Sequence, residues 1–228
     1  KRVAHGAMMA SSDLAVNAYL AAYSLSMEDI PTAPDFKVLR ETALAHLARF
    51  ATTEHGLRQM LDRRLRRWAT RAVRAGLPEE EAEATIASLR PAVDDVVSAM
   101  TELGAVDDAG FARSRALNLT RTGRSRRAVA AHLATKGVDQ NITQDALNES
   151  LGERSDDSAH EAELAAALVL ARKRRVGPFC RPDRPQEDPM RVMGIFARNG
   201  FSRDVVQTAL EMDPEEAEDR IIAFRSRP

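Results

Sequence analysis

Cysteine, aromatic residues and long apolar runs are scarce in this sequence. Cys180 is the single cysteine among 228 residues, which excludes a disulfide framework and a cysteine-based metal site within the chain. Aromatic residues make up only 4% of the sequence, so few side chains are available to stack on nucleic-acid bases. The longest strictly apolar run, 164–171, is far shorter than the roughly 20 residues that cross a bilayer. We therefore expect a cytoplasmic protein in a reducing compartment, without membrane contact.

The sequence also lacks the patterns that mark common active sites. Its five histidines show neither HxxxH nor HExxH spacing, and neither a glycine-rich phosphate loop nor a GxSxG motif occurs. The acidic pairs Asp94-Asp95 and Asp107-Asp108 join adjacent residues, whose side chains point about 100° apart on a helix and chelate a metal poorly. We expect no catalytic residue, no metal site and no cofactor, and hence a protein that is not an enzyme.

Helical periodicity is the main structural signal that the sequence does contain. Alanine, leucine, arginine and glutamate dominate, and apolar residues recur every three or four positions from Asp35 onward. Sustained strand alternation does not occur, so we predict an all-α fold. Helices are expected at 36–50, 57–72, 79–103, 108–119, 125–133, 139–147, 162–175, 188–198 and 202–210, with a short one from 213.

Capping residues and breakers indicate where these helices begin and end. Gly137 is expected to terminate the helix before it, and Pro91 is expected to bend or split the helix at 79–103. Residues 1–34, which end at two prolines, form an expected extension with a short helix that begins at Ser12 or Asp13. N-caps are expected at Asp108, Ser125, Asp139, Asp188 and Ser202.

An internal repeat relates two parts of the chain. Residues 132–149 align without gaps with 195–212, at an offset of 63, and five of the 18 aligned positions are identical. Both copies follow the order helix, glycine, apolar residue, cap and helix, and a weaker third copy precedes them near 73–77. Two unrelated helix–glycine–helix units could match as well as this, so the alignment alone leaves chance similarity open.

The net charge of −1 conceals an alternation of charge along the chain. Segments 46–75, 111–137 and 164–184 carry +6, +7 and +5, whereas 76–110, 138–163 and 185–228 carry −8, −7 and −3. The sign changes in step with the repeat, which gives each unit a basic front and an acidic back. Two explanations stay open: neighbouring units neutralise one another, or the basic segments bind an external polyanion.

Three clusters of basic residues are the candidate binding sites. The first lies on a helix whose buried stripe includes Leu65 and Trp68, so several of its arginines must project outward. The second surrounds Gly123 at a helix start, where positive charge opposes the helix dipole and so suggests an anionic partner. The third ends a helix, where positive charge is intrinsically favoured. The candidate residues are Arg63, Arg64, Arg67, Arg71, Arg113, Arg121, Arg124, Arg126, Arg127, Lys136, Arg172, Lys173, Arg174 and Arg175.

Several motifs, taken in order, resemble the RecX family. Residues 102–147, which begin ELGAVDDAGFARSRAL, are similar to its central signature: Leu-Gly-Tyr-Leu-Asp-Asp, Phe-Ala, an arginine-bearing helix, a basic glycine turn and a helix that ends at Lys-Gly. LARFATTEHGLRQMLDRRLRRWA resembles the family's first unit, and FARNGFSRDVVQTAL resembles its last. The resemblance covers about 35–212, with Ala105 and Val106 in place of the usual Tyr-Leu.

The resemblance implies an elongated, curved monomer of three tandem three-helix repeats. Their expected bounds are 35–104 with an insertion near 70–90, 105–152, and 158–228 with a proline-rich connector at 176–189. It further implies a non-catalytic regulator of the RecA recombinase that binds the RecA filament on single-stranded DNA. Such a regulator restrains filament growth, ATP hydrolysis and strand exchange, and the basic candidates would contact the filament.

Two other functions remain open from the residues themselves. A helical-repeat protein with these basic clusters could bind DNA or RNA directly, without sequence preference, through phosphate contacts. Single- or double-stranded DNA is therefore a candidate direct partner beside RecA. Alternatively, the basic clusters pair with acids inside the chain, and the protein is a scaffold that binds other proteins.

Overall fold

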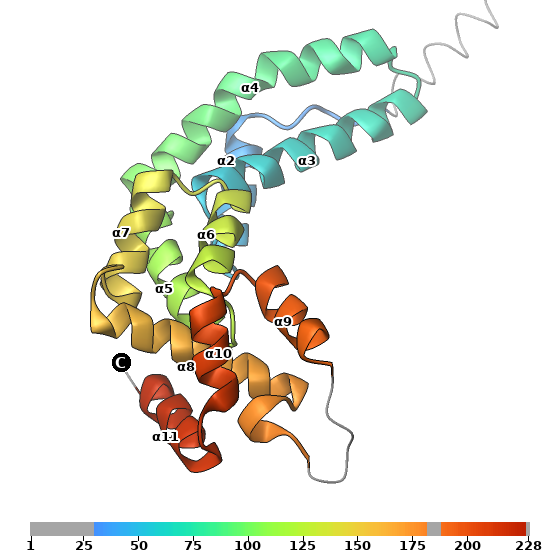
Figure 1. Ribbon diagram of the computed structural model, residues 1–228. Helices are drawn as coiled ribbons and strands as arrows, with labels where there is room; N and C mark the ends of the chain where they lie inside the picture. Colours follow the sequence, from blue (N-terminus) through green and yellow to red (C-terminus); the bar gives the residue numbers. More distant parts are fainter. Residues whose placement is uncertain (1–29, 182–187, 227–228) are drawn as a thin grey trace, which may run out of the picture. The chain divides into compact units, whose positions relative to one another are not determined.

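The computed structural model describes residues 30–181 and 188–226. These residues form ten α-helices and the 3-10 helix η1 (Gly177–Phe179), with no strand among them, which confirms the all-α prediction (Figure 1). They divide into two compact units: Leu57–Ala105 with the described residues before 51, and Ala51–Gly56 with Val106 onward. The residue bounds of three separate repeats stay a prediction. The short helix expected at Ser12 or Asp13 lies outside the described residues.

The first unit contains α2 (Phe36–Leu47), most of α3 (Glu54–Arg74) and α4 (Glu79–Glu102). Its buried side chains keep the helical spacing expected from the sequence, and α2 packs on α4. The Trp68 indole Nε1 donates to the Pro31 carbonyl at 2.7 Å, and Arg58 Nε donates to Asp94 Oδ1 at 2.8 Å. The buried residues are Leu39, Ala43, Leu57, Leu61, Leu65, Trp68, Ala69, Ala72, Ala82, Ile86, Val93, Val96, Val97 and Met100.

Pro91 does not split α4, contrary to one of the two outcomes expected from the sequence. The helix is continuous from Glu79 to Glu102 with Pro91 inside it. A proline removes one backbone hydrogen bond from the helix. Here its ring is exposed, while Ile86 and Val93 on either side remain buried in the core. Packing of the apolar face therefore holds the helix together across the proline.

The second unit contains seven further α-helices, and most of their predicted caps are confirmed. The Ser125, Asp139 and Asp188 side chains each accept a hydrogen bond from the first turn of the following helix. Ser202 stands at its expected position but makes no such bond. The helices are α5 (Asp108–Arg121), α6 (Arg126–Thr135), α7 (Gln140–Leu151), α8 (Asp157–Arg174), α9 (Pro189–Arg198), α10 (Arg203–Glu211) and α11 (Pro214–Arg225).

The prediction of Asp108 as an N-cap is wrong. Asp107 caps α5, because its Oδ1 accepts from the Gly110 N–H at 2.9 Å. The Asp108 Oδ1 instead accepts from the Glu54 N–H at 2.9 Å, at the start of α3. Thr53 strengthens the same junction, since its Oγ1 donates to the Lys136 carbonyl at 2.7 Å. The Asp108 carboxylate, which was expected to cap its own helix, thus binds the start of α3, 54 residues earlier in the chain.

The internal repeat corresponds to repeated backbone geometry. Helices α6 and α9 begin 63 residues apart, and so do α7 and α10. After α6 the Val138 N–H donates to the Leu133 carbonyl, and after α9 the Phe201 N–H donates to the Phe196 carbonyl, both at 3.2 Å. This bond is the signature of a Schellman C-cap. We call α5–α7 the second repeat and α8–α10 the third repeat.

Helix α8 is buried around its whole circumference over 164–171. Each of these eight residues is at most 6% exposed. Ala162 and Ala165 join the core formed with α5, α6 and α7, while Leu164 and 166–171 join the core formed with α9, α10 and α11. A helix that is apolar on every face is stable only inside a protein core. Over the described residues, no helix combines the length and apolarity needed to span a membrane.

Close approach to α8 requires a glycine at the end of α5. Gly123 has a φ of +90°, and a Cβ added there would lie 3.1 Å from the Leu170 nitrogen. Both the positive φ and the short distance exclude larger side chains. The turn before α6 therefore rests directly on the backbone of α8, which positions the basic residues that follow it.

We predict that Leu168→Ala destabilises the second unit by about 2–5 kcal/mol, because it leaves a cavity in a fully buried helix. Leu168 is 0% exposed. Ile222→Ala is the matched control, since Ile222 is 55% exposed and its truncation should cost little. Urea unfolding of the full chain, followed by circular dichroism, measures both. Equal destabilisation by the two variants would contradict the central role of α8.

Candidate functional site

Four arginines form a continuous row on α3, which we call the arginine stripe. Arg64, Arg67, Arg71 and Arg74 line one shallow depression of about 430 Å³. Their spacing of three and four residues places them on one face of the helix. Among the described residues, none of the four makes an ion pair, in contrast to Arg58 earlier on the same helix. The stripe therefore offers an uncompensated positive surface.

A second basic surface arises where the third repeat contacts the second. The Ser125 Oγ accepts from the Ala128 N–H at 3.1 Å and donates to the Asn199 carbonyl at 2.6 Å. Gly200 follows with a φ of +83°, and a Cβ there would lie 2.6 Å from the Ser125 Oγ. The turn between α9 and α10 is thus seated on the first turn of α6. Ser125, which was predicted only as the N-cap of one helix, therefore also joins the second repeat to the third.

The contact forms a groove of about 400 Å³ with positive charge along its walls, which we call the basic groove. The exposed side chains of Arg124, Arg127 and Arg198 line it together with His132. Burial, followed by the charges of Lys136, Arg124 and Arg115, lowers the pKa of His132. A neutral imidazole therefore accompanies the arginines at neutral pH. The groove combines fixed walls with several cationic groups, which suits an anionic partner.

Arg126, predicted as a binding residue, is buried and committed to the fold. It is 9% exposed, and its guanidinium donates to the Gly152 carbonyl and the Asn148 Oδ1. Its backbone N–H donates to Glu163 Oε2 at 2.8 Å, which ties α6 to α8. Burial lowers the pKa of Arg126 and raises the pKa of Glu163. We therefore leave Arg126 out of the binding surfaces.

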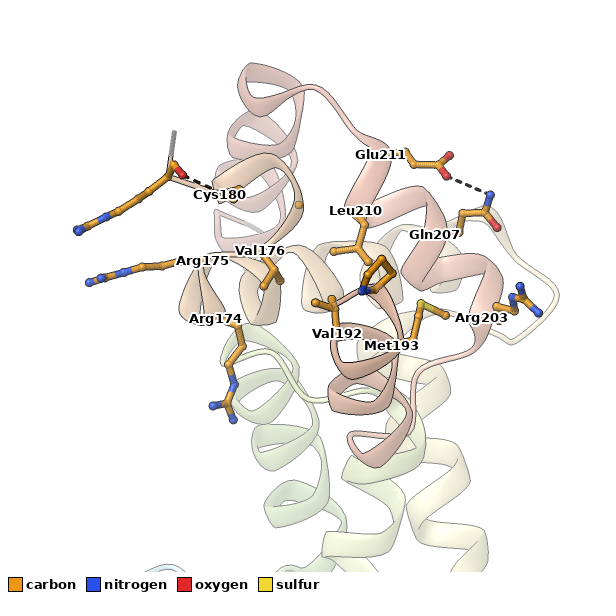
Figure 2. A pocket seen from close by; sticks show the side chains of 13 residues that line it. Arg174, Arg175, Val176, Cys180, Val192, Met193, Arg203, Gln207, Leu210 and Glu211 are labelled. Carbon is orange, nitrogen blue, oxygen red and sulfur yellow. Dashed lines mark hydrogen bonds between the residues drawn. The ribbon is translucent and has the colours of Figure 1, made fainter. Parts of the chain in front are cut away.

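The predicted basic cluster at 172–175 contains two residues whose side chains bond within the chain and two whose side chains make no such bond among the described residues. Arg172 pairs with Glu218 at 2.5 Å, and Lys173 Nζ donates to the Thr122 carbonyl. Arg174 and Arg175 remain exposed at the edge of a third cavity (Figure 2). Arg175 has a φ of +59° and ends α8 in the left-handed conformation. The first two cations stabilise the fold, and the last two face solvent.

The remaining predicted residues lie outside the stripe and the groove. Arg113 pairs with Glu149 at 3.5 Å, and Arg121 is half-buried in the last turn of α5. Arg63 is exposed on α3 but does not line the arginine stripe, and Lys136 is exposed at the end of α6. The structure thus gathers Arg64, Arg67 and Arg71 in one surface, and Arg124 and Arg127 in another.

Two arginines of these surfaces, Arg74 and Arg198, were not among the candidate residues. Arg74 continues the helical spacing of the arginine stripe, a signal that was available in the sequence. Arg198 enters the basic groove only because Asn199 bonds to Ser125, 74 residues earlier. That tertiary contact has no local sequence signal. Over the described residues, no group of three or more histidine, cysteine or acidic side chains is arranged to hold a metal ion.

Three similar proteins are all named regulatory protein RecX. A family profile described as "RecX, second three-helix domain" matches residues 107–147. Regulatory protein RecX of Myxococcus xanthus is 30% identical over 179 residues, which cover 77% of this chain and 86% of the relative. Regulatory protein RecX of Agrobacterium fabrum is 29% identical over 189 residues, 83% of this chain and 90% of the relative. Regulatory protein RecX of Mycolicibacterium vanbaalenii is 35% identical over 149 residues, which cover 59% of this chain and 76% of the relative. No solved structure matches the chain significantly.

The neighbours Arg126 and Arg127 should respond differently to truncation. We predict that Arg126→Ala lowers the free energy of unfolding by about 1–3 kcal/mol, because the Gly152 carbonyl and the Asn148 amide lose a buried charged donor. Arg127→Ala should change it by less than about 0.5 kcal/mol, because Arg127 is exposed. Chemical denaturation of the full-length variants measures both. A stable Arg126→Ala protein would contradict the structural assignment.

Proposed function

Because the chain belongs to the RecX family, we propose that it is a regulator of the RecA recombinase without catalytic activity of its own. In this proposal it binds the RecA filament on single-stranded DNA and restrains filament growth, ATP hydrolysis and strand exchange. The relatives are named regulatory proteins, and the basic candidates fit a filament of negatively charged DNA and protein. The observation that carries the proposal is the presence of two uncompensated arginine surfaces.

The arginine stripe suits an extended rather than a compact anionic partner. From Arg64 to Arg74 it runs ten residues along α3, which is about 15 Å at 1.5 Å per residue. Guanidinium groups form paired hydrogen bonds with phosphate or carboxylate oxygens. A row of such groups can therefore engage several anionic groups of a filament at once, whether they belong to DNA or to acidic protein side chains.

The basic groove complements the stripe because its cations sit on a prearranged support. Arg124 and Arg127 flank the buried Ser125, and the bond from Ser125 to Asn199 holds the opposite wall with Arg198. A support that is already ordered lowers the entropy cost of binding. The residues that line the groove include no Phe, Tyr or Trp, so we assign it to charge recognition and not to base stacking.

Direct binding of DNA or RNA is the alternative that the same arginines support. The two functions differ in the preferred target. A RecA regulator should bind RecA-coated single strands more tightly than naked strands. A direct nucleic-acid binder should bind both comparably, with an affinity that falls steeply between about 50 and 200 mM salt.

We predict that the double variants Arg124→Glu/Arg127→Glu and Arg64→Glu/Arg71→Glu each bind RecA-coated DNA about tenfold more weakly than the wild type. Each reversal removes an attraction of several tenths of a kcal/mol or more and adds a repulsion. Fluorescence anisotropy with labelled single strands, coated and naked, measures the affinity. Circular dichroism melting checks that the fold is retained, since all four arginines lie at least partly in solvent.

The double variant Arg191→Glu/Arg225→Glu is the control, because it changes the net charge by the same amount as each test variant. Both arginines are exposed, and neither lines the arginine stripe or the basic groove. This variant should bind the coated strand like the wild type. Unchanged binding by either test variant, with unchanged melting, removes that surface from the proposal. Comparable wild-type affinity for coated and naked strands would favour the alternative.

A further inference from the structure

The third repeat contains a cavity that the two basic surfaces do not account for. It has a volume of about 700 Å³ and lies between the end of α8, η1, α9 and α10. Figure 2 shows the apolar side chains of Val176, Val192, Met193 and Leu210 converging on its floor. We call it the third-repeat cavity. Its size and its apolar floor are typical of sites that bind a ligand side chain or a small molecule.

Comparison with the second repeat explains why the cavity is open. At the offset of 63 residues, Pro189 corresponds to Arg126, and Glu211 corresponds to Asn148. In the second repeat the Arg126 guanidinium reaches the Asn148 side chain and fills the space between the two helices. In the third repeat the same two positions line the cavity. Proline has no side chain that could cross this space, so the position that a side chain fills in the second repeat is left open in the third.

The rim of the cavity is strongly positive and determines the charge of its occupant. Arginines stand around the apolar floor, and those labelled in Figure 2 point away from it toward solvent. Glu211 is the acidic residue of the lining, and its Oε1 accepts from the Gln207 Nε2 at 3.1 Å. The occupant should therefore carry acidic groups around an apolar centre. The rim arginines are Arg174, Arg175, Arg181 and Arg203.

We propose that the third-repeat cavity binds an acidic peptide segment of a protein partner, which inserts an apolar side chain between α9 and α10 while its carboxylates meet the rim arginines. This binding site goes beyond the proposed function. The proposed binding depends on the shape and charge of the third repeat. It applies to any partner protein that presents such a segment. The apolar anchor supplies most of the contact area, and the charges select acidic over basic sequences.

A synthetic peptide tests the proposal without RecA or DNA. The probe is a fluorescein-labelled peptide, Asp-Glu-Asp-Leu-Leu-Glu-Asp-Glu, titrated with the full chain in fluorescence anisotropy. Two control peptides replace either the leucines by serine or the acids by lysine. We expect saturable binding of the first peptide, at least about tenfold weaker binding of the serine peptide and no binding of the lysine peptide.

Arg175→Gly/Arg203→Gln is the variant that links the binding to the rim. Glycine accommodates the left-handed conformation of Arg175 better than arginine does, so this variant should fold at least as stably as the wild type. We expect it to bind the acidic peptide about tenfold more weakly. Arg191→Gln/Arg225→Gln, with the same change of charge outside the cavity, should bind normally.

Several results would overturn the proposal. These are absence of acidic-peptide binding up to about 1 mM, equal binding of the leucine and serine peptides, or unchanged binding by Arg175→Gly/Arg203→Gln. A short poly-thymidine strand that displaces the peptide as efficiently as unlabelled peptide would assign the rim to phosphate binding instead. Because RecA is absent from the assay, failure of the proposed function cannot produce any of these results.

Discussion

The burial of α8 on every face is the constraint on which the second unit depends. Its apolar run at 164–171 belongs to the cores of both the second and the third repeat. The turn that carries Arg124 and Arg127 rests on the same helix through Gly123. Glu163, one residue before the run, accepts the backbone N–H of Arg126 and so fixes the start of α6. The helix that fills the core thereby also sets the position of the basic groove.

Basic residues in this protein perform two different tasks. Some stabilise the fold by pairing within the second unit, as Arg126, Arg172 and Lys173 do. Others, in the arginine stripe and the basic groove, stay at least partly exposed and make no ion pair within the described part of the chain. The basic segments of the alternating charge pattern thus contain, among the described residues, both internally paired and unpaired cations. Internal pairing therefore accounts for some of the basic residues, and binding of an external polyanion by the exposed ones stays a proposal.

The sequence predicts the local structure well because local structure depends on neighbouring residues. The caps at Ser125, Asp139 and Asp188 and the stop at Gly137 follow from short patterns, and all are confirmed. Residues whose role depends on distant contacts could not be predicted in this way. The Asp108 carboxylate bonds to a helix 54 residues away, and the burial of Arg126 depends on Asn148 and Gly152.

The same limit applies to the candidate sites. The arginine stripe is nearly complete in the sequence prediction because it lies on one helix. The basic groove needs Arg198, which the bond between Ser125 and Asn199 brings to Arg124 and Arg127. The third-repeat cavity arises because Pro189 stands where the second repeat has Arg126. The sequence shows this difference, but only the structure shows that the Arg126 side chain fills the corresponding space.

The most direct test of the account is the single-strand-dependent ATP hydrolysis of RecA, measured while the full chain is added below one copy per RecA. A regulator that acts on the filament should lower the rate at substoichiometric ratios, since one bound copy affects several subunits. The double variant Arg124→Glu/Arg127→Glu should require more protein for the same effect. An unchanged rate at ratios up to one copy per RecA would contradict the central claim that this protein regulates the RecA filament.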